Sequence, residues 1–189
     1  MKSKFYLSFM VAVCMGLSLF AVGSNAAHEL THKYEAKNTV TPKDNEIIGV
    51  LMVLNKNEIA VANAVLKKTS NPVIIKYARM LKKEHTKNLN KTLRISKKIG
   101  AMPIESAVSK KLQRHGEDEL RVLSTLQGQP LDKKFISLMV KDHSDALHLI
   151  DTKLLKYVSN PMLKEQIIAT RPHIAKHLED AKQIQMSLK

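Results

Sequence analysis

Four residues far apart in the chain have side chains that bind metals, and they occupy matching places in the helical pattern. Each lies near the middle of an amphipathic segment, on its apolar face; they are Glu58, His85, His143 and His177. Carboxylate and imidazole groups are ordinary ligands for zinc, copper, iron or manganese. Without an ion, buried groups of this kind must hydrogen-bond to one another, because each unpartnered one costs roughly 1–3 kcal/mol. The sequence therefore predicts a single transition-metal site or a closed polar network, and leaves both open.

The segments that carry these residues are long helices with an apolar period of 3.6 residues. We expect helices at about 44–68, 72–99, 106–126, 132–157 and from 161 to the C-terminus. Ser-Asn-Pro occurs at 70–72 and again at 159–161. It predicts a tight turn, because Asn caps a helix and Pro suits the first helical position. Pro172 lies inside the last helix and predicts a kink near residues 168–169.

Two helical hairpins with a helix between them predict an all-α fold, namely a ferritin-like four-helix bundle with a helical crossover. The spacing also predicts that the four polar residues share one level. Glu58 and His85 lie about 14 and 13 residues from the proline of the first turn, or roughly 20 Å. His143 and His177 lie about 18 and 16 residues from the proline of the second, or roughly 25 Å. The two levels agree to about 5 Å whether the turns lie at the same end or at opposite ends.

The first 26 residues resemble a secretory signal peptide. Lys2 and Lys4 precede an apolar run over 5–22, and small residues follow at 24–26. We therefore expect a signal peptide at 1–26, a flexible segment at 27–43 and a bundle domain at 44–189, in an exported protein that is periplasmic or associated with the outer membrane. A retained membrane anchor is the alternative, because the run approaches spanning length.

The chain is strongly basic, with a formal net charge of +14. Such a charge favours an anionic envelope component or an acidic protein as partner, and peripheral membrane contact. Nucleic acid is not expected, because export and the near absence of aromatic residues between the basic pairs argue against it. The alternative is that the lysines merely form solvated helix faces. The sequence leaves the oligomeric state open.

Other candidate residues are weaker. His173 precedes His177 by four residues, a spacing that can present both to one ion, so it is a secondary metal candidate at the rim. His115 and His148 are expected to face solvent. No phosphate-binding loop, nucleophile elbow or Cys–His pair occurs, so the sequence predicts no catalytic residues and no organic cofactor.

Short motifs along most of the chain match those of a known family. They are Glu58, Ala78-Arg79-Met80, Glu84-His85, Leu131-Asp132, Phe135, His143, Pro172 and His177. Through them, residues from about 47 to 186 resemble the exported, ferritin-like domain-of-unknown-function family 4142. Where this chain has Leu131 and Phe135, the family usually has Phe and often Tyr, which affects packing only. The resemblance implies a fold and a periplasmic or outer-membrane location, and little about function.

A ferritin-like fold suggests di-iron oxidation, but the ligand pattern argues against it. Di-iron sites take a Glu from each of two helices and Glu-x-x-His from the other two. Here the residues three before His85 and His177 are Lys82 and Ile174. We therefore predict a non-enzymatic protein whose Glu/His centre binds a metal ion or small ligand, in metal handling or envelope stress. The alternative is a basic, envelope-associated interaction protein in which the cluster is a structural hydrogen-bond network.

Overall fold

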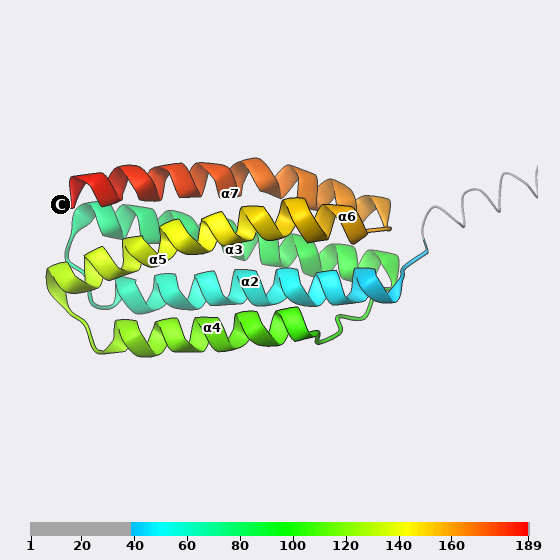
Figure 1. Cartoon of the computed structure of the whole chain (residues 1–189), viewed down its shortest axis with the longest axis horizontal. Coiled ribbons are helices and arrows are strands. Elements are labelled where there is room, and N and C mark those ends of the chain that lie inside the picture. The colour runs from blue at the N-terminus through cyan, green and yellow to red at the C-terminus, as the bar shows by residue number, and fades with distance from the viewer. Residues whose placement is uncertain (1–38, 189) are drawn as a thin grey trace, which may run out of the picture. The chain divides into compact units, whose positions relative to one another are not determined.

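The computed structural model describes residues 39–188, and within this range the chain forms helices and no strands (Figure 1). The long helices are α2 (Pro42–Leu66), α3 (Pro72–Ile99), α4 (Ala107–Ser124), α5 (Gly128–Leu149) and α7 (Pro161–Ser187). A π-helical turn, η1 (Ile150–Leu154), and a short helix, α6 (Leu155–Tyr157), connect α5 to α7. The prediction of an all-α chain is confirmed. The expected signal peptide, and the expected flexible segment as far as residue 38, lie outside the described residues.

The helices lie side by side in a bundle. Helices α2 and α3 form one antiparallel hairpin, α5 and α7 form another, and α3 also packs along α7. Helix α4 lies along α2 and carries the chain back over the length of the bundle (Figure 1). The two Ser-Asn-Pro turns consequently lie at opposite ends of the bundle.

Both turns use the predicted capping chemistry. The Asn71 side chain accepts a hydrogen bond from the Val73 N–H at 3.0 Å. The Asn160 side chain accepts bonds from the N–H groups of Met162 and Leu163, at 3.0 and 3.3 Å. A proline occupies the first turn of each following helix, where its missing N–H costs nothing.

Helix α2 begins at Pro42, two residues earlier than expected, because Thr41 and Asp44 form a capping box. The Thr41 hydroxyl accepts from the Asp44 N–H at 3.1 Å, and Asp44 Oδ2 accepts from the Thr41 N–H at 2.9 Å. Asp44 Oδ1 also accepts from the N–H groups of Ser159 and Asn160, at 2.9 and 3.1 Å. One completely buried carboxylate therefore joins the start of α2 to the turn before α7.

The core has two apolar parts separated by a polar layer. Residues such as Val61, Leu81 and Phe135 form one apolar cluster, and residues such as Ile48 and Ile167 form the other. Between them in the helical register lie the buried or half-buried residues Asn55, His85, Asn88, His143 and His177. Together with Gln166, which lies within the second cluster and donates a hydrogen bond to Asn88, we call these residues the polar layer. Buried polar groups require specific partners, so this layer is where a function would reside.

Two helices have local irregularities, one at a π-helical turn and one at a proline. The third long segment is interrupted by the π-helical turn at Ile150–Leu154, which the apolar period did not indicate. Helix α7 continues through Pro172, whose missing N–H deprives the Ile168 carbonyl of its usual partner. A kink at this place stays a prediction.

Helix α2 is the one helix among residues 39–188 that is long and apolar enough to cross a bilayer. It packs against α3 and α4, and 44% of its most apolar window is buried inside the bundle. A core helix of a bundle has the same length and composition.

Gly49 allows the connection between α3 and α4 to lie directly against α2. A Cβ atom at Gly49 would approach the carbonyl oxygen of Ile104 to 2.4 Å. That connection is also held by a hydrogen bond from the Ile104 N–H to the Asn45 carbonyl at 3.1 Å. We expect Gly49→Ala to lower the free energy of unfolding by about 1–3 kcal/mol, because a backbone carbonyl cannot rotate away as a side chain can. Urea unfolding measures this change, and a variant as stable as the wild type would contradict the close approach.

Candidate metal centre

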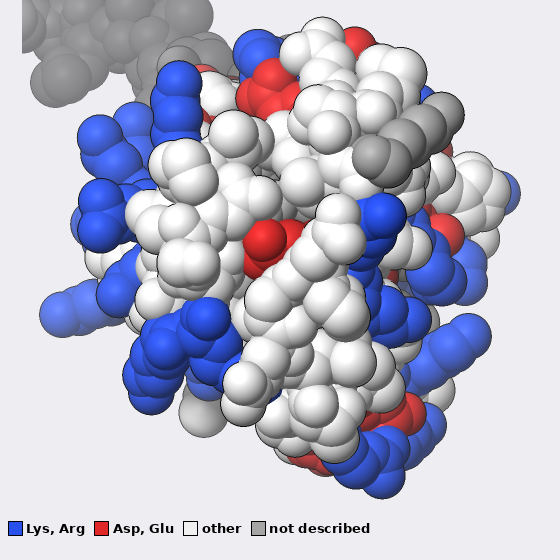
Figure 2. All heavy atoms as spheres, turned by 90° about the vertical axis from the view of Figure 1, so that its left-hand side faces the viewer, with Lys and Arg blue, Asp and Glu red and all other residues white. Residues whose placement is uncertain are grey.

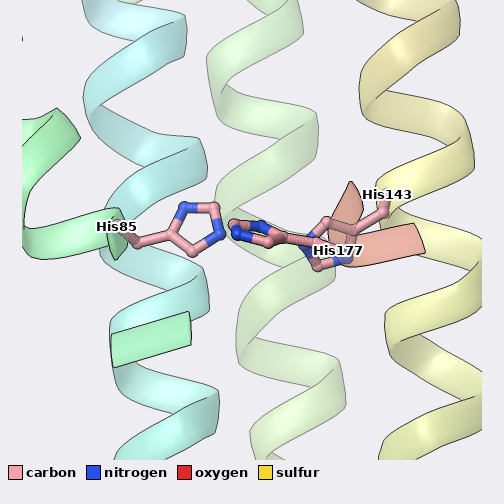
Figure 3. Close-up of side chains that lie close together, drawn as sticks. All are labelled: His85, His143 and His177. Carbon is pink, nitrogen blue, oxygen red and sulfur yellow. The ribbon is translucent and has the colours of Figure 1, made fainter. Parts of the chain in front are cut away.

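Three histidines from three different helices meet in the polar layer. His85 of α3, His143 of α5 and His177 of α7 point toward one another (Figure 3). The ring centroids are separated by 5.3 to 5.9 Å, and one nitrogen from each ring lies within 4.8 Å of the other two. All three residues are at least 95% buried. The structure therefore brings together the three imidazoles that the sequence placed at one level.

The outward hydrogen bond of each ring defines which nitrogen carries the proton. His85 Nδ1 lies 3.0 Å from the side-chain oxygen of Asn55, and His143 Nδ1 lies 2.8 Å from the carbonyl oxygen of Met139. His177 Nε2 lies 2.9 Å from a carboxylate oxygen of Glu84. Each of these partners is an acceptor, so each of these ring nitrogens must donate. The inward nitrogens, Nε2 of His85 and His143 and Nδ1 of His177, are then the unprotonated ones.

The orientation of the Asn55 amide is fixed by its neighbours. Its Nδ2 group donates to the Leu51 carbonyl at 2.7 Å, and its oxygen accepts from Asn88 Nδ2 at 3.2 Å. The Asn88 oxygen in turn accepts from Gln166 Nε2 at 3.1 Å and from the Thr170 hydroxyl at 3.2 Å. The amide oxygen of Asn55 therefore faces His85, and this ring is held as a donor.

Three nitrogen lone pairs converge in the centre of the bundle with no hydrogen-bond partner. The inward nitrogens of His85, His143 and His177 are all enclosed and make no hydrogen bond to any described residue. Acceptors cannot bond to one another, so the three rings do not form a closed network. A cation is a group that can satisfy three inward lone pairs at once. In known sites, metal-binding histidines likewise donate their other N–H to a carboxylate, a backbone carbonyl or another acceptor.

Burial keeps the three rings neutral and ready to bind. It lowers the pKa of His143 to about 4, with a further contribution from His177. The pKa of His85 is well below its usual range, because of burial and of the two neighbouring rings. The pKa of His177 is also lowered by burial, against the opposing effect of Glu84. At neutral pH a metal ion therefore does not have to displace a proton from these rings.

Glu58 does not join the three imidazoles. It is not among the groups whose ligand atoms approach one another at the histidine centre, and Asn55, one helical turn earlier on α2, contacts His85 instead. The Glu58 carboxylate lies beside Asp142, and its Oε2 is enclosed without a hydrogen-bond partner. Burial, and secondly Asp142, raise its pKa to about 8.

His173 lies at the rim of the centre, whereas Glu84 contacts His177. The His173 side chain is 67% exposed, and its Nδ1 lies 3.5 Å from Glu84 Oε2. It therefore remains at the rim, as expected, and does not point into the centre. Glu84, which orients His177, was not identified as functional from the helical period. Its place immediately before His85 in a family motif was the one available signal.

His115 faces neighbouring acids as well as solvent. Its Nε2 lies 3.0 Å from Asp142 Oδ1 and 3.0 Å from Glu119 Oε1, although 41% of its side chain is exposed. The helical period predicts a surface position for this residue and does not single out Glu119 or Asp142. The spacing of four residues between His115 and Glu119 on one helix could have indicated the pair.

A surface cavity lies beside the histidine centre. Its volume is about 320 Å³, and its walls include His85 and His177. Three exposed lysines of α3, at positions 83, 87 and 91, form part of its lining. Two of the three histidines therefore line a cavity with a basic rim.

In the metal-free protein, we expect the free energy of unfolding to fall less with rising pH in Glu58→Gln than in the wild type. The folded-state pKa of Glu58 is about 8, above the ordinary value of 4.5. Its stability contribution is present below the ordinary pKa and is lost as pH rises toward 8. We compare the free energy of unfolding of the variant with that of the wild type. Between about pH 5 and about pH 8, this difference should shift in favour of the variant by roughly 2–4 kcal/mol. Urea unfolding at both pH values measures this, with the exposed Glu165→Gln as control; parallel profiles for Glu58→Gln and wild type would contradict it.

Comparison with known proteins identifies a family and a fold. Residues 29–184 match the family described as "Domain of unknown function (DUF4142)", so the chain belongs to this family. No curated protein is significantly similar to the chain in sequence. Among solved structures, the crystal structure of a DUF305 fragment from Deinococcus radiodurans is similar, with a TM-score of 0.68. The two chains are 15% identical, and the match covers 78% of this chain and 97% of the other, so the likeness concerns the fold alone.

Proposed function

We propose that this member of the DUF4142 family is an exported, non-enzymatic protein that binds one transition-metal ion through His85, His143 and His177. In this proposal the domain is a ferritin-like four-helix bundle of α2, α3, α5 and α7, with α4 as the crossover. It acts in metal handling or envelope stress. The observation that carries the proposal is the convergence of three enclosed ring nitrogens that have no hydrogen-bond partner.

The donor set favours late first-row metals. Imidazole nitrogens suit zinc, copper, iron and nickel, whereas manganese and magnesium prefer oxygen. Affinity at such a site rises along the divalent series to copper and falls again at zinc. We therefore expect Cu²⁺ and Zn²⁺ to bind more tightly than Mn²⁺. Three protein ligands leave a coordination position for water or another small ligand.

The surroundings of the centre fit uptake and release of an ion. The cavity beside His85 and His177 gives access from solvent, and the Glu84 carboxylate beside His177 supplies negative charge. Glu84 is 39% exposed, so it faces both the ring and the surface. A site that an ion can reach and leave suits handling of the metal rather than permanent structural binding.

The test is calorimetric titration of the purified protein with Zn²⁺ and Cu²⁺, together with elemental analysis. We expect one ion per chain at this centre. Glu84→Gln should weaken binding by roughly 10–100-fold, because it removes the negative charge of the acceptor that orients a ligating histidine and raises its basicity, and such changes have effects of that size. The exposed Glu165→Gln is the matched control. If Glu84→Gln binds Zn²⁺ and Cu²⁺ as tightly as the wild type, His177 is not a ligand in this orientation.

The alternative function is docking of the basic surface on an anionic envelope component or an acidic protein. Lys and Arg side chains surround the end of the bundle seen in Figure 2, with mostly uncharged residues in its middle. This function predicts binding to anionic vesicles or polysaccharide that weakens as salt increases. It also predicts that metal has no effect on that binding.

A further inference from the structure

A second group of possible metal ligands lies next to the histidine centre, outside the site described so far. Helix α4 contributes His115 and Glu119, and helix α5 contributes Asp142. One ligand atom from each of these residues lies within 4.8 Å of the other two. Asp142 directly precedes His143, so adjacent residues of α5 serve the two groups.

One oxygen of the Glu119 carboxylate lies in this group without a hydrogen-bond partner. The Glu119 side chain is 7% exposed, and its Oε1 is enclosed and makes no hydrogen bond to any described residue. His115 Nε2 lies 3.0 Å away from it, but the hydrogen bond of that nitrogen goes to Asp142 Oδ1, also at 3.0 Å. The second oxygen of Asp142 is likewise enclosed and unpartnered. Two buried carboxylates thus share one imidazole.

Glu58 adds a third carboxylate to the same cavity. This cavity has a volume of about 100 Å³, and its walls include Glu58, His115, Glu119 and Asp142. Glu58 Oε2 is enclosed and makes no hydrogen bond to a described residue. Lys141, the basic residue next to Asp142 in sequence, pairs instead with Asp145 at 2.6 Å. His115 is therefore the basic side chain that directly contacts this group of acids, and Lys141 acts on Glu119 through its charge without pairing with it.

Buried carboxylates are stable only when protonated, paired or bound to a cation. Burial and Asp142 raise the pKa of Glu119 to about 9, so protons can fill this role in the metal-free protein. The carboxylates of Glu119 and Asp142 and the imidazole of His115 are also a suitable ligand set for a divalent cation that prefers oxygen, such as Mn²⁺ or Fe²⁺. The neighbouring centre offers nitrogen only, so the two sites select different ions.

From this geometry we infer that His115, Glu119 and Asp142 form a second divalent-cation site, with Glu58 in the wall of the same cavity, and that this site is richer in oxygen than the three-histidine centre. It does not depend on the proposed function, because the two sites share no ligand. It also differs from a di-iron site between α2, α3, α5 and α7, since α4 supplies two of its ligands.

The test uses Mn²⁺ as the probe, because the electron paramagnetic resonance signal of the free aqueous ion is lost when it binds. We expect one Mn²⁺ per chain. Glu119→Gln should weaken Mn²⁺ binding by roughly tenfold or more, since removing a ligand costs at least as much as removing a residue that orients one. Glu117→Gln, an exposed change on the same helix, should have no effect. His177→Ala should also leave Mn²⁺ binding unchanged, while it weakens Zn²⁺ at the first centre.

Glu119→Gln preserves side-chain size, and circular dichroism verifies its helix content. His115→Ala is the second variant, and its half-exposed position makes it compatible with folding; it should weaken Mn²⁺ as well. The inference is overturned by absence of stoichiometric Mn²⁺ binding or by Mn²⁺ binding that neither variant weakens. Loss of Mn²⁺ in His177→Ala with retention in Glu119→Gln also overturns it, because the ion would then occupy the histidine centre.

Discussion

Replacement of His143 by leucine should abolish the metal-induced rise in melting temperature while the metal-free protein stays as stable as the wild type. In the wild type, an ion at 100 times its dissociation constant should raise the melting temperature by about 5–10 °C. His143 is 98% buried and its inward nitrogen has no partner, so in the metal-free protein it is a cost. Leucine fills a similar volume without an unsatisfied lone pair, and we expect a change within about 1 kcal/mol of the wild type, or a gain.

This variant separates a metal site from a structural network, because the two predict opposite results. A network that held the fold together would make His143→Leu several kcal/mol less stable, and metal would have no effect on the wild type. His148→Leu is the matched control, since His148 is exposed on the same helix. Thermal melting of all three proteins, with a chelator and with Zn²⁺, measures both quantities.

Asp44→Ala should lower the free energy of unfolding by about 3–4 kcal/mol, a large effect for a single polar side chain. The Asp44 carboxylate accepts bonds from the N–H groups of Thr41, Ser159 and Asn160 at 2.9, 2.9 and 3.1 Å, and a further bond from the Thr41 hydroxyl. Burial alone would raise its pKa, but these hydrogen bonds lower it overall. Alanine would leave buried N–H groups without acceptors at the junction of α2 and the turn before α7.

Urea unfolding gives the loss for Asp44→Ala, and Asp118→Ala serves as the control. Asp118 is an exposed carboxylate that pairs with Arg121 on the surface of α4, so its removal should change stability little. An Asp44→Ala variant that loses no more than the control would contradict the role of this carboxylate in joining the two hairpins.

The arrangement of helices could be predicted because it rests on local chemistry. The Ser-Asn-Pro turns contain both the cap and the first helical residue, and the apolar period identifies the inward face of each helix. A constant rise per residue then places His85, His143 and His177 at one level, and the structure brings the three rings together.

The details of the centre depend on the exact rotation of each helix about its axis and on its position along that axis. The apolar period identifies the inward face, but it does not distinguish between inward residues that lie one turn apart. Asn55 and Glu58 both lie on the inner part of α2, and only the packed structure shows that Asn55 contacts His85. The protonated nitrogen of each ring depends on partners from other helices, such as Glu84 for His177. The role of His115 depends on how α4 lies against α2 and α5, and that contact has no signature within α4 alone.

The most direct measurement of the central claim is long-range ¹H–¹⁵N NMR of the histidine rings, with and without Zn²⁺. In the metal-free protein we predict protons on Nδ1 of His85 and His143 and on Nε2 of His177. One equivalent of Zn²⁺ should shift the other nitrogen of each ring, which are Nε2, Nε2 and Nδ1. Protons on the inward nitrogens, or three rings that do not respond to Zn²⁺, would contradict a metal centre at this place.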